Sequence, residues 1–233
     1  MKMRGEGKSP PRVSLKEVLV SWVGAFLGIF AVGFLGHLVH LEQQDILFLI
    51  GSFGASAVLL YGTPGVPLAQ PRNLMGGHIL SALTGVLMNG WIADPLYLSG
   101  ALSVETAIAV MHLTKTTHPP GGATALIAVI GSERVHQLGF LYVLSPVALG
   151  ALIMLVVALI VNNLTSFRRY PVFWCRQQRH PKPSVTQISD PLLNHRSDHQ
   201  LVPSELLCFL KSLIDFIQQG FKAQVFGAYI SEA

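Results

Sequence analysis

The side chains best suited to binding a solute are concentrated in one short stretch, residues 115–124, which reads KTTHPPGGAT. Prolines are tolerated in the first turn of a helix, so we expect a short helix to begin at Pro119, capped by Thr117 and His118. The N–H groups at a helix N-terminus lack intrahelical partners, and glycines let a ligand approach the backbone, so such an end attracts anions. The stretch therefore predicts a small-anion site with the candidate residues Lys115, Thr117, His118, Gly121, Gly122 and Thr124.

A second stretch predicts a related element facing the same site. Residues 54–59 (GASAVL) align with residues 122–127 (GATALI), so we expect Gly54 to open a helix and Ser56 to offer a hydroxyl to the ligand. Arg72 and Asn73 follow a Pro/Gly-rich turn and would supply a cation and an amide. Two alternatives stay open, because the glycines can serve close helix packing and Arg72 can be a charge that only sets the topology.

One acidic residue lies inside an otherwise apolar segment. Glu105 is near the middle of residues 96–114, where an unpaired charge would be costly in a membrane, and His112 follows two helical turns later on the same face. We interpret the two residues as candidates for a proton relay. The alternative is a structural buried hydrogen bond from Glu105, with the possible partners His37, His40 and His78.

The chain lacks the motifs of common enzyme classes. No H-E-x-x-H, G-x-S-x-G or Walker A pattern occurs, and the nine histidines form no grouping with the spacing of a hydrolytic metal site. Both cysteines, Cys175 and Cys208, lie in the C-terminal part, so they build no metal site or disulfide in the core. We expect no enzyme, no catalytic residue, no metal and no cofactor.

The elements that must position the candidate residues are apolar segments. Only 12% of the 233 residues are charged while 51% are hydrophobic, which argues against an ordinary soluble domain. The net charge of +4 gathers beside apolar segments, so we expect a membrane surface and no nucleic acid as partner. The fold class is therefore all-α, a polytopic transmembrane helical bundle. Its segments are expected at about residues 18–41, 46–62, 73–91, 96–114, 119–130 and 138–164.

The similarity between the second and fifth segments suggests two three-helix repeats. If all six segments cross, the second repeat is inverted relative to the first, a plan found in many secondary transporters with short, broken helices at the binding site. Such matches also arise by chance in a Gly/Ala/Leu-rich chain. Lys and Arg cluster at the two ends, which predicts that both termini are cytosolic, or stromal in a plastid envelope. This bias does not distinguish six spans from four.

Composition divides the chain into four parts. Residues 1–17 form a basic cytosolic N-terminus and residues 18–164 the transmembrane domain. Residues 165–202 are polar enough to predict a disordered linker. Apolar residues at helical spacing within 203–233 predict an amphipathic helix that lies on the membrane or the protein, or docks a partner.

Three blocks of the sequence resemble the HPP family of integral membrane proteins. They are residues 118–126 (HPPGGATAL), 53–60 (FGASAVLL) and 67–73 (PLAQPRN), and the likeness extends over about residues 15–175. The family is usually described with four transmembrane helices, and its plant plastid and cyanobacterial members are implicated in nitrite transport. The resemblance therefore implies nitrite as substrate, a small planar monoanion that the candidate residues could bind.

The residues and the resemblance together predict a transporter or channel for a small inorganic anion, with nitrite as the first candidate. Its partners would be the anion and membrane lipid, and a homo-oligomer is left open. The alternative is a non-transporting membrane scaffold or sensor whose cytosolic tail docks a partner.

Overall fold

The computed structural model describes residues 12–92 and 95–174, and these residues contain helices and no strand. All the described helices belong to one compact unit, which ends at Pro171. The predicted helix in 203–233 and most of the predicted linker at 165–202 lie outside the described residues, as does most of the basic N-terminus.

All six predicted helical segments are present. The elements in chain order are α1 (Leu15–Leu38), α2 (Gln43–Ala57) with a π-helical extension (Val58–Gly62), a 3-10 turn (Pro67–Ala69), α3 (Pro71–Trp91), α4 (Leu96–Thr114), α5 (Pro120–Ile130), α6 (Glu133–Leu138), and a π-helical turn (Val143–Ala148) that leads into α7 (Leu149–Asn163).

Four of the described helices are long and apolar enough to cross a membrane: α1, α2 with its extension, α4, and α7 with its preceding turn. Helix α3 has 21 residues but carries buried polar side chains, among them His78, Ser81 and Thr84. Helix α5 has only 11 residues. Of the six predicted segments, four are therefore both long enough and apolar enough to span a membrane. The internal duplication stays a prediction.

The structure corrects three details of the predicted segments. Gly54 does not open a helix, because α2 runs without a break through that position. Helix α5 begins at Pro120 instead of Pro119, and Pro119 takes the N-cap position predicted for Thr117 and His118, with no side-chain hydrogen bond that caps the helix. The last segment is divided because Gly139 ends α6 with a positive φ of 49° and Ser145 is non-helical within the turn before α7.

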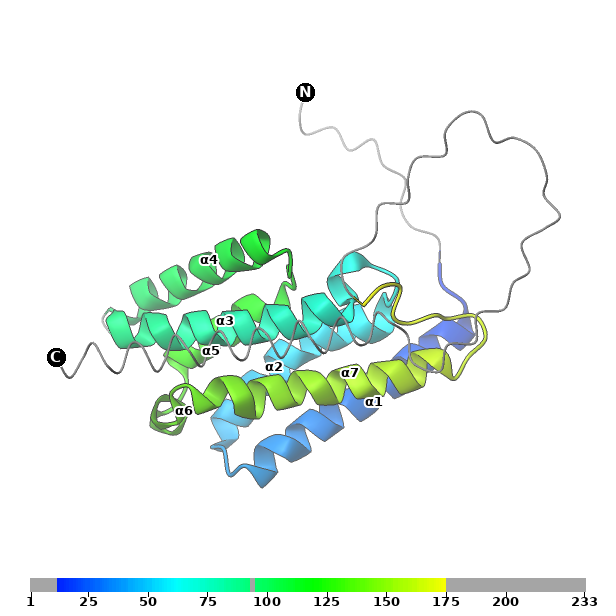
Figure 1. Cartoon of the computed structure of the whole chain (residues 1–233). Helices are drawn as coiled ribbons and strands as arrows, with labels where there is room; N and C mark the ends of the chain where they lie inside the picture. Colours follow the sequence, from blue (N-terminus) through cyan, green and yellow to red (C-terminus); the bar gives the residue numbers. More distant parts are fainter. Residues whose placement is uncertain (1–11, 93–94, 175–233) are drawn as a thin grey trace, which may run out of the picture. The chain divides into compact units, whose positions relative to one another are not determined.

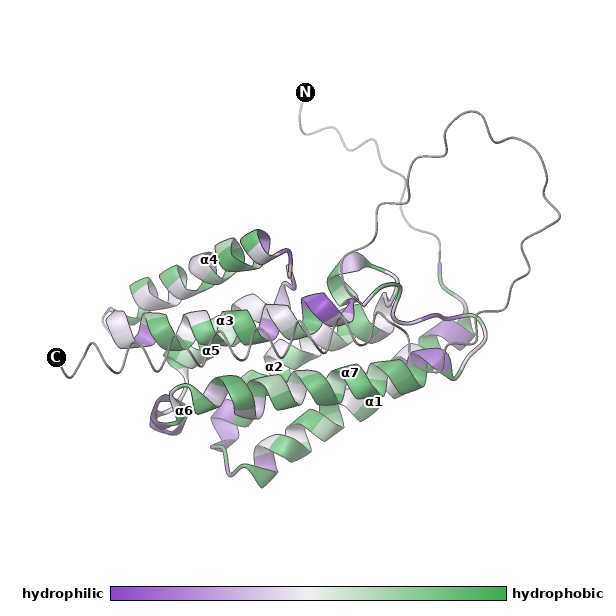
Figure 2. Ribbon diagram, in the orientation of Figure 1, coloured by the Kyte–Doolittle hydropathy of each residue, from purple (hydrophilic) through white to green (hydrophobic). Residues whose placement is uncertain are grey.

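Helix α3 lies at the centre of one side of the bundle, packed against both α5 and α4 (Figure 1). On the other side α1 packs against α7 and α2, and contacts between α2 and α5 join the two sides. Figure 2 shows hydrophilic residues near helix ends, as at the start of α1 and in α6, and hydrophobic residues along α1 and α7. This distribution is that of a bundle whose outer surface faces lipid.

Small residues allow two close helix contacts. A Cβ added to Gly77 of α3 would collide with the Cβ of His118, and one added to Gly121 of α5 would lie 2.8 Å from the Gly77 carbonyl oxygen. On α1, a Cβ at Gly24 would lie 2.6 Å from the Tyr61 ring, so this glycine allows α1 to pack closely against the π-helical extension of α2. Small side chains at helix crossings are how membrane bundles gain packing area.

One buried cation ties three helix ends together. The Arg168 guanidinium, after α7, forms an ion pair with Glu17 in the first turn of α1. It also donates to the Tyr61 carbonyl at the end of α2 (3.1 Å) and to the Asn162 amide oxygen (2.9 Å). The side chain is 2% exposed, so nearly all of its hydrogen-bonding capacity is met inside the protein.

We predict that Gly77→Ala destabilises the protein by about 2 kcal/mol, because overpacking a tight contact forces the helices apart. Gly90→Ala on the same helix is the matched control, since a Cβ there meets nothing within 4 Å. Thermal unfolding of the purified proteins in detergent measures both. Equal midpoints for the two variants would contradict the close α3–α5 contact.

We predict that Arg168→Ala costs about 3 kcal/mol of stability, because it leaves the Glu17 carboxylate without its cation and the buried Asn162 amide oxygen without a donor. In a protein of this size that loss lowers the unfolding midpoint by roughly 6–12 °C. The neighbouring Arg169 is exposed, so Arg169→Ala should leave the midpoint nearly unchanged. A comparable drop in both variants would show that charge, and not the buried contacts, matters here.

Candidate functional site

Five polar side chains form a continuous hydrogen-bonded cluster inside the bundle, which we call the His–Ser network. Ser56 Oγ lies 2.8 Å from Nε2 of His78 and 2.9 Å from Nε2 of His118. Nδ1 of His78 lies 2.8 Å from Thr124 Oγ1, which in turn lies 2.8 Å from Ser52 Oγ. None of the five residues is more than 1% exposed.

The direction of these hydrogen bonds follows from one carbonyl group. The Leu68 carbonyl can only accept, so the contact of 2.8 Å requires His118 Nδ1 to carry the proton. In a neutral imidazole Nε2 of His118 is then an acceptor, and the Ser56 hydroxyl donates to it. Having one hydrogen, Ser56 must accept from Nε2 of His78, whose Nδ1 accepts from Thr124. Every donor finds an acceptor with both imidazoles neutral.

Three elements bring the network together. Ser52 and Ser56 are one helical turn apart and share a face of α2, and the Ser52 hydroxyl also contacts the Pro120 carbonyl at 2.9 Å. His78 comes from α3 and stacks on Phe53 at 4.5 Å between ring centroids. The close contact between α3 and α5 places His118, just before α5, and Thr124 of α5 beside His78.

Arg72 and Asn73, at the start of α3, hold the link between α4 and α5 in place. Arg72 Nη2 donates to the Thr114 carbonyl (2.6 Å), so the guanidinium caps the end of α4. Asn73 Nδ2 donates to the Thr117 carbonyl (2.8 Å), next to His118. Both residues therefore position the network in this structure rather than enter it.

The 3-10 turn before α3 is fixed from another direction. The Tyr170 hydroxyl donates to the Ala69 carbonyl at 2.7 Å, one residue after the carbonyl that accepts from His118. Burial, followed by the nearby Tyr61, raises the pKa of Tyr170, so its hydroxyl stays protonated and able to donate.

The N-terminus of α5 differs from the anion site that the sequence suggests. Its two prolines have no N–H, and the next two N–H groups are used locally: Gly121 donates to the His118 carbonyl (2.8 Å) and Gly122 to the Pro119 carbonyl (3.0 Å). Gly54, predicted as a second helix start, lies inside α2 and partly exposed. In this conformation the two glycine stretches do not present paired helix N-termini to one pocket.

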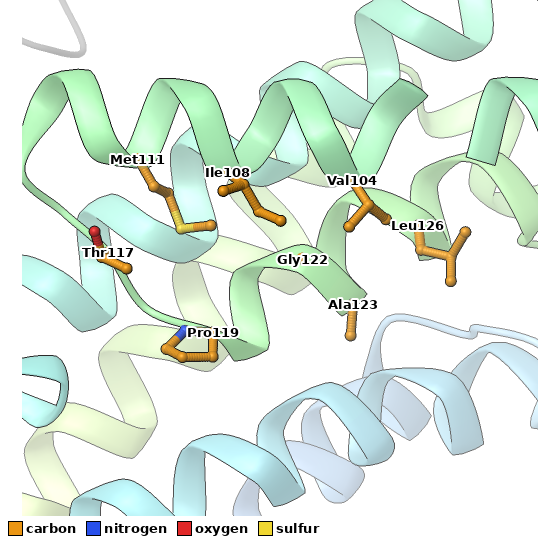
Figure 3. A pocket seen from close by; sticks show the side chains of 8 residues that line it. All are labelled: Val104, Ile108, Met111, Thr117, Pro119, Gly122, Ala123 and Leu126. Atoms are coloured by element: carbon orange, nitrogen blue, oxygen red, sulfur yellow. The ribbon is translucent and has the colours of Figure 1, made fainter. Parts of the chain in front are cut away.

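An open groove runs along the other face of α5, between α4 and α5 (Figure 3). Its volume is about 510 Å³. Thr117 contributes a polar side chain, and apolar groups make up the rest of the lining, with the residues Val104, Ile108, Met111, Pro119, Gly122, Ala123 and Leu126. Gly122 faces this groove, whereas Thr124 faces the network.

The remaining candidates lie at the surface of α4. Lys115 ends α4 in the left-handed conformation with a φ of 59° and is exposed. Glu105 and His112 are exposed as well, so Glu105 is not buried against a histidine. Their role in proton transfer stays a prediction.

Two members of the network were not predicted from the sequence. His78 was considered only as a partner for Glu105, and Ser52 was not singled out. Two hydroxyls one turn apart on α2 could have indicated a polar face on an otherwise apolar helix. In the described part of the chain, no three His, Cys, Asp or Glu side chains converge where a metal ion could bind.

Fold and site define a polytopic helical membrane protein with a polar network in its core. A model of the HPP transmembrane region matches residues 10–171, so the chain belongs to the HPP family. It is similar to two transmembrane proteins of Dictyostelium discoideum. One is 49% identical over 176 residues, 74% of this chain and 56% of that protein. The other is 43% identical over 173 residues, 73% of this chain and 60% of that protein.

The matched region is thus a little over half the length of these relatives. No solved structure matches the chain.

We predict that Ser56→Ala destabilises the protein by about 3 kcal/mol, because it leaves an acceptor nitrogen and a donor N–H buried without partners. Thr63→Ala is the control, since that hydroxyl is exposed and contacts only the Leu59 carbonyl of its own turn. Thermal unfolding in detergent measures the difference. If Ser56→Ala unfolds at the wild-type temperature, the bridging hydroxyl does not stabilise the network.

Proposed function

We propose that this protein transports a small inorganic anion across a membrane, with the His–Ser network as the binding site. The network is the observation that carries the proposal. Polar side chains inside a membrane bundle are costly and usually mark a solute path or a binding site. Five of them, contributed by α2, α3, α5 and the α4–α5 link, lie side by side here.

The chemistry of the network suits a small planar anion. Its hydroxyls and imidazoles can donate to oxygen atoms in several directions without fixing a single geometry. Nitrite is our first candidate, and it rests on the resemblance to plastid and cyanobacterial family members. The network groups do not by themselves separate nitrite from nitrate or bicarbonate.

A substrate can enter only if the network opens. Its members satisfy one another, so an anion must displace bonds such as those of Ser56 to the two histidines. The groove beside α5 leaves room for this short helix to move away from α3. We propose alternating exposure of the site through such a movement, in a transporter and not an enzyme.

The orientation and partners belong to the same proposal. We place both termini on the cytosolic side, or the stromal side in a plastid envelope, because Lys and Arg collect at the chain ends. The partners are the anion and the surrounding lipid, and the site as described lies within one chain, whether or not copies associate.

We predict that the purified protein in proteoliposomes takes up labelled nitrite faster than protein-free vesicles do. His118→Ala should lower the rate roughly tenfold or more, the equivalent of one lost hydrogen bond of about 1.4 kcal/mol. His37→Ala, an exposed histidine of α1, should transport like wild type. Competition by nitrate and bicarbonate then ranks the anions.

The same assay tests the alternative. A network whose members are all satisfied internally is also what a purely structural core would show. If folded wild-type protein takes up neither nitrite, nitrate nor bicarbonate, the transport proposal fails and a membrane scaffold or sensor remains.

A further inference from the structure

The His–Ser network contains no permanent cation. The buried charged residues in the described part of the chain are Asp45 and Arg168, and both are engaged elsewhere. Asp45, near the start of α2, accepts from the Ser132 N–H (3.0 Å). Arg168 lies near the other end of α2 and pairs with Glu17 of α1. An anion that entered the network alone would therefore be a buried charge without a counterion, which is strongly unfavourable.

Other titratable groups do not compensate this charge. Arg72 of α3 donates to the end of α4, and Lys115, Glu105 and His112 of α4 are exposed. Helix α5 contributes no titratable side chain, and Tyr61 of the π-helical extension of α2 donates to the Met154 carbonyl on α7. Tyr142, before α7, donates to the Thr124 carbonyl, so it faces the network as a neutral hydroxyl. The remaining proton acceptors are the two imidazoles.

Each imidazole has one nitrogen that can take a proton. In the hydrogen-bond order set by the Leu68 carbonyl, these are Nε2 of His118 and Nδ1 of His78. A proton on Nε2 of His118 turns that atom into a donor, so Ser56 can no longer donate to it. The Ser56 hydroxyl hydrogen is then free for an incoming anion, and the imidazolium supplies the missing positive charge.

The network has room for one such proton and not two. The imidazole rings of His78 and His118 lie 4.9 Å apart between centroids and share the Ser56 hydroxyl. Two cations at that separation would repel each other, so the second protonation is disfavoured.

We propose that the His78–Ser56–His118 bridge takes up one proton with each anion, so that the protein carries a monoanion and a proton together as a neutral pair. This inference rests on the proposed anion transport. The proton binds a bare imidazole nitrogen as the anion enters and leaves with it on the other side, and no covalent bond to the anion forms.

The test uses the full chain in proteoliposomes, with a trapped pH dye and with the potential set by potassium and valinomycin. Initial uptake rates in protein-free vesicles are subtracted, since nitrous acid crosses lipid unaided. One-to-one coupling predicts that an inward proton gradient of one pH unit, a driving force of about tenfold, speeds the initial protein-dependent uptake of nitrite, whereas a potential of about 59 mV leaves that rate unchanged. Nitrite addition should also bring protons into the vesicles.

Two variants locate the coupling. Gln in place of His118 keeps a polar side chain but cannot be protonated, so the slower uptake that remains in His118→Gln should respond to potential and no longer to pH. His78→Gln reports on the other nitrogen, and His37→Gln on α1 should keep the wild-type response. Because the wild-type measurement is decisive by itself, poor folding of a variant does not leave the proposal open.

The outcomes separate this inference from the proposed function. Wild-type uptake driven by potential and indifferent to pH would overturn proton coupling while transport stands. Loss of the pH response in Glu105→Gln, with both histidine variants still pH-driven, would move the coupling to α4 and overturn our assignment. Absence of uptake of nitrite, nitrate and bicarbonate by folded protein would overturn the transport function and this inference with it.

Discussion

Inside a membrane bundle there is no bulk water to satisfy a polar group, and this constraint governs the core of the protein. The His–Ser network meets it with a chain of hydrogen bonds that ends at the Leu68 carbonyl, which sets the direction of the chain. A defect at one link would leave donors or acceptors unpaired further along. The positions of α2, α3 and α5 are therefore linked through a few side chains.

Close backbone approach makes that chain possible. Without side chains at Gly77 and Gly121, α3 and the start of α5 come close together, so that His78 of α3 and His118 of the α4–α5 link reach the same hydroxyl of α2. Gly121 of the HPPGG segment thus serves helix packing, one of the two interpretations that the sequence left open for the glycines, while Gly122 faces the groove and the histidine before them enters the network.

Charged residues in this structure act mainly on helix ends. Arg72 caps α4 and Arg168 joins the ends of α2 and α7 to the start of α1. Both guanidiniums satisfy carbonyl groups that a helix leaves free at its C-terminus. This arrangement leaves the centre of the bundle electrically neutral, which is why the ionisation state of two histidines matters for any anion there.

The sequence by itself determined where the long helices and α5 lie, but not the short helix α6. The segment predicted at 96–114 matches α4 residue for residue, and the short helix predicted from Pro119 is present from Pro120, because apolar length and proline are local signals. The number of spanning segments stayed open. Helix α3 is long, but its small and polar residues are explained only by its central position in the bundle, where they are buried.

Only the tertiary structure decided which side chains meet. Helices that are apolar on every side carry little periodicity, so the sequence does not say which face is inward. That Ser52, Ser56 and His78 share one cluster depends on the way α2, α3 and α5 pack. The same packing left Glu105 exposed, because the burial of a side chain depends on neighbours distant in the chain.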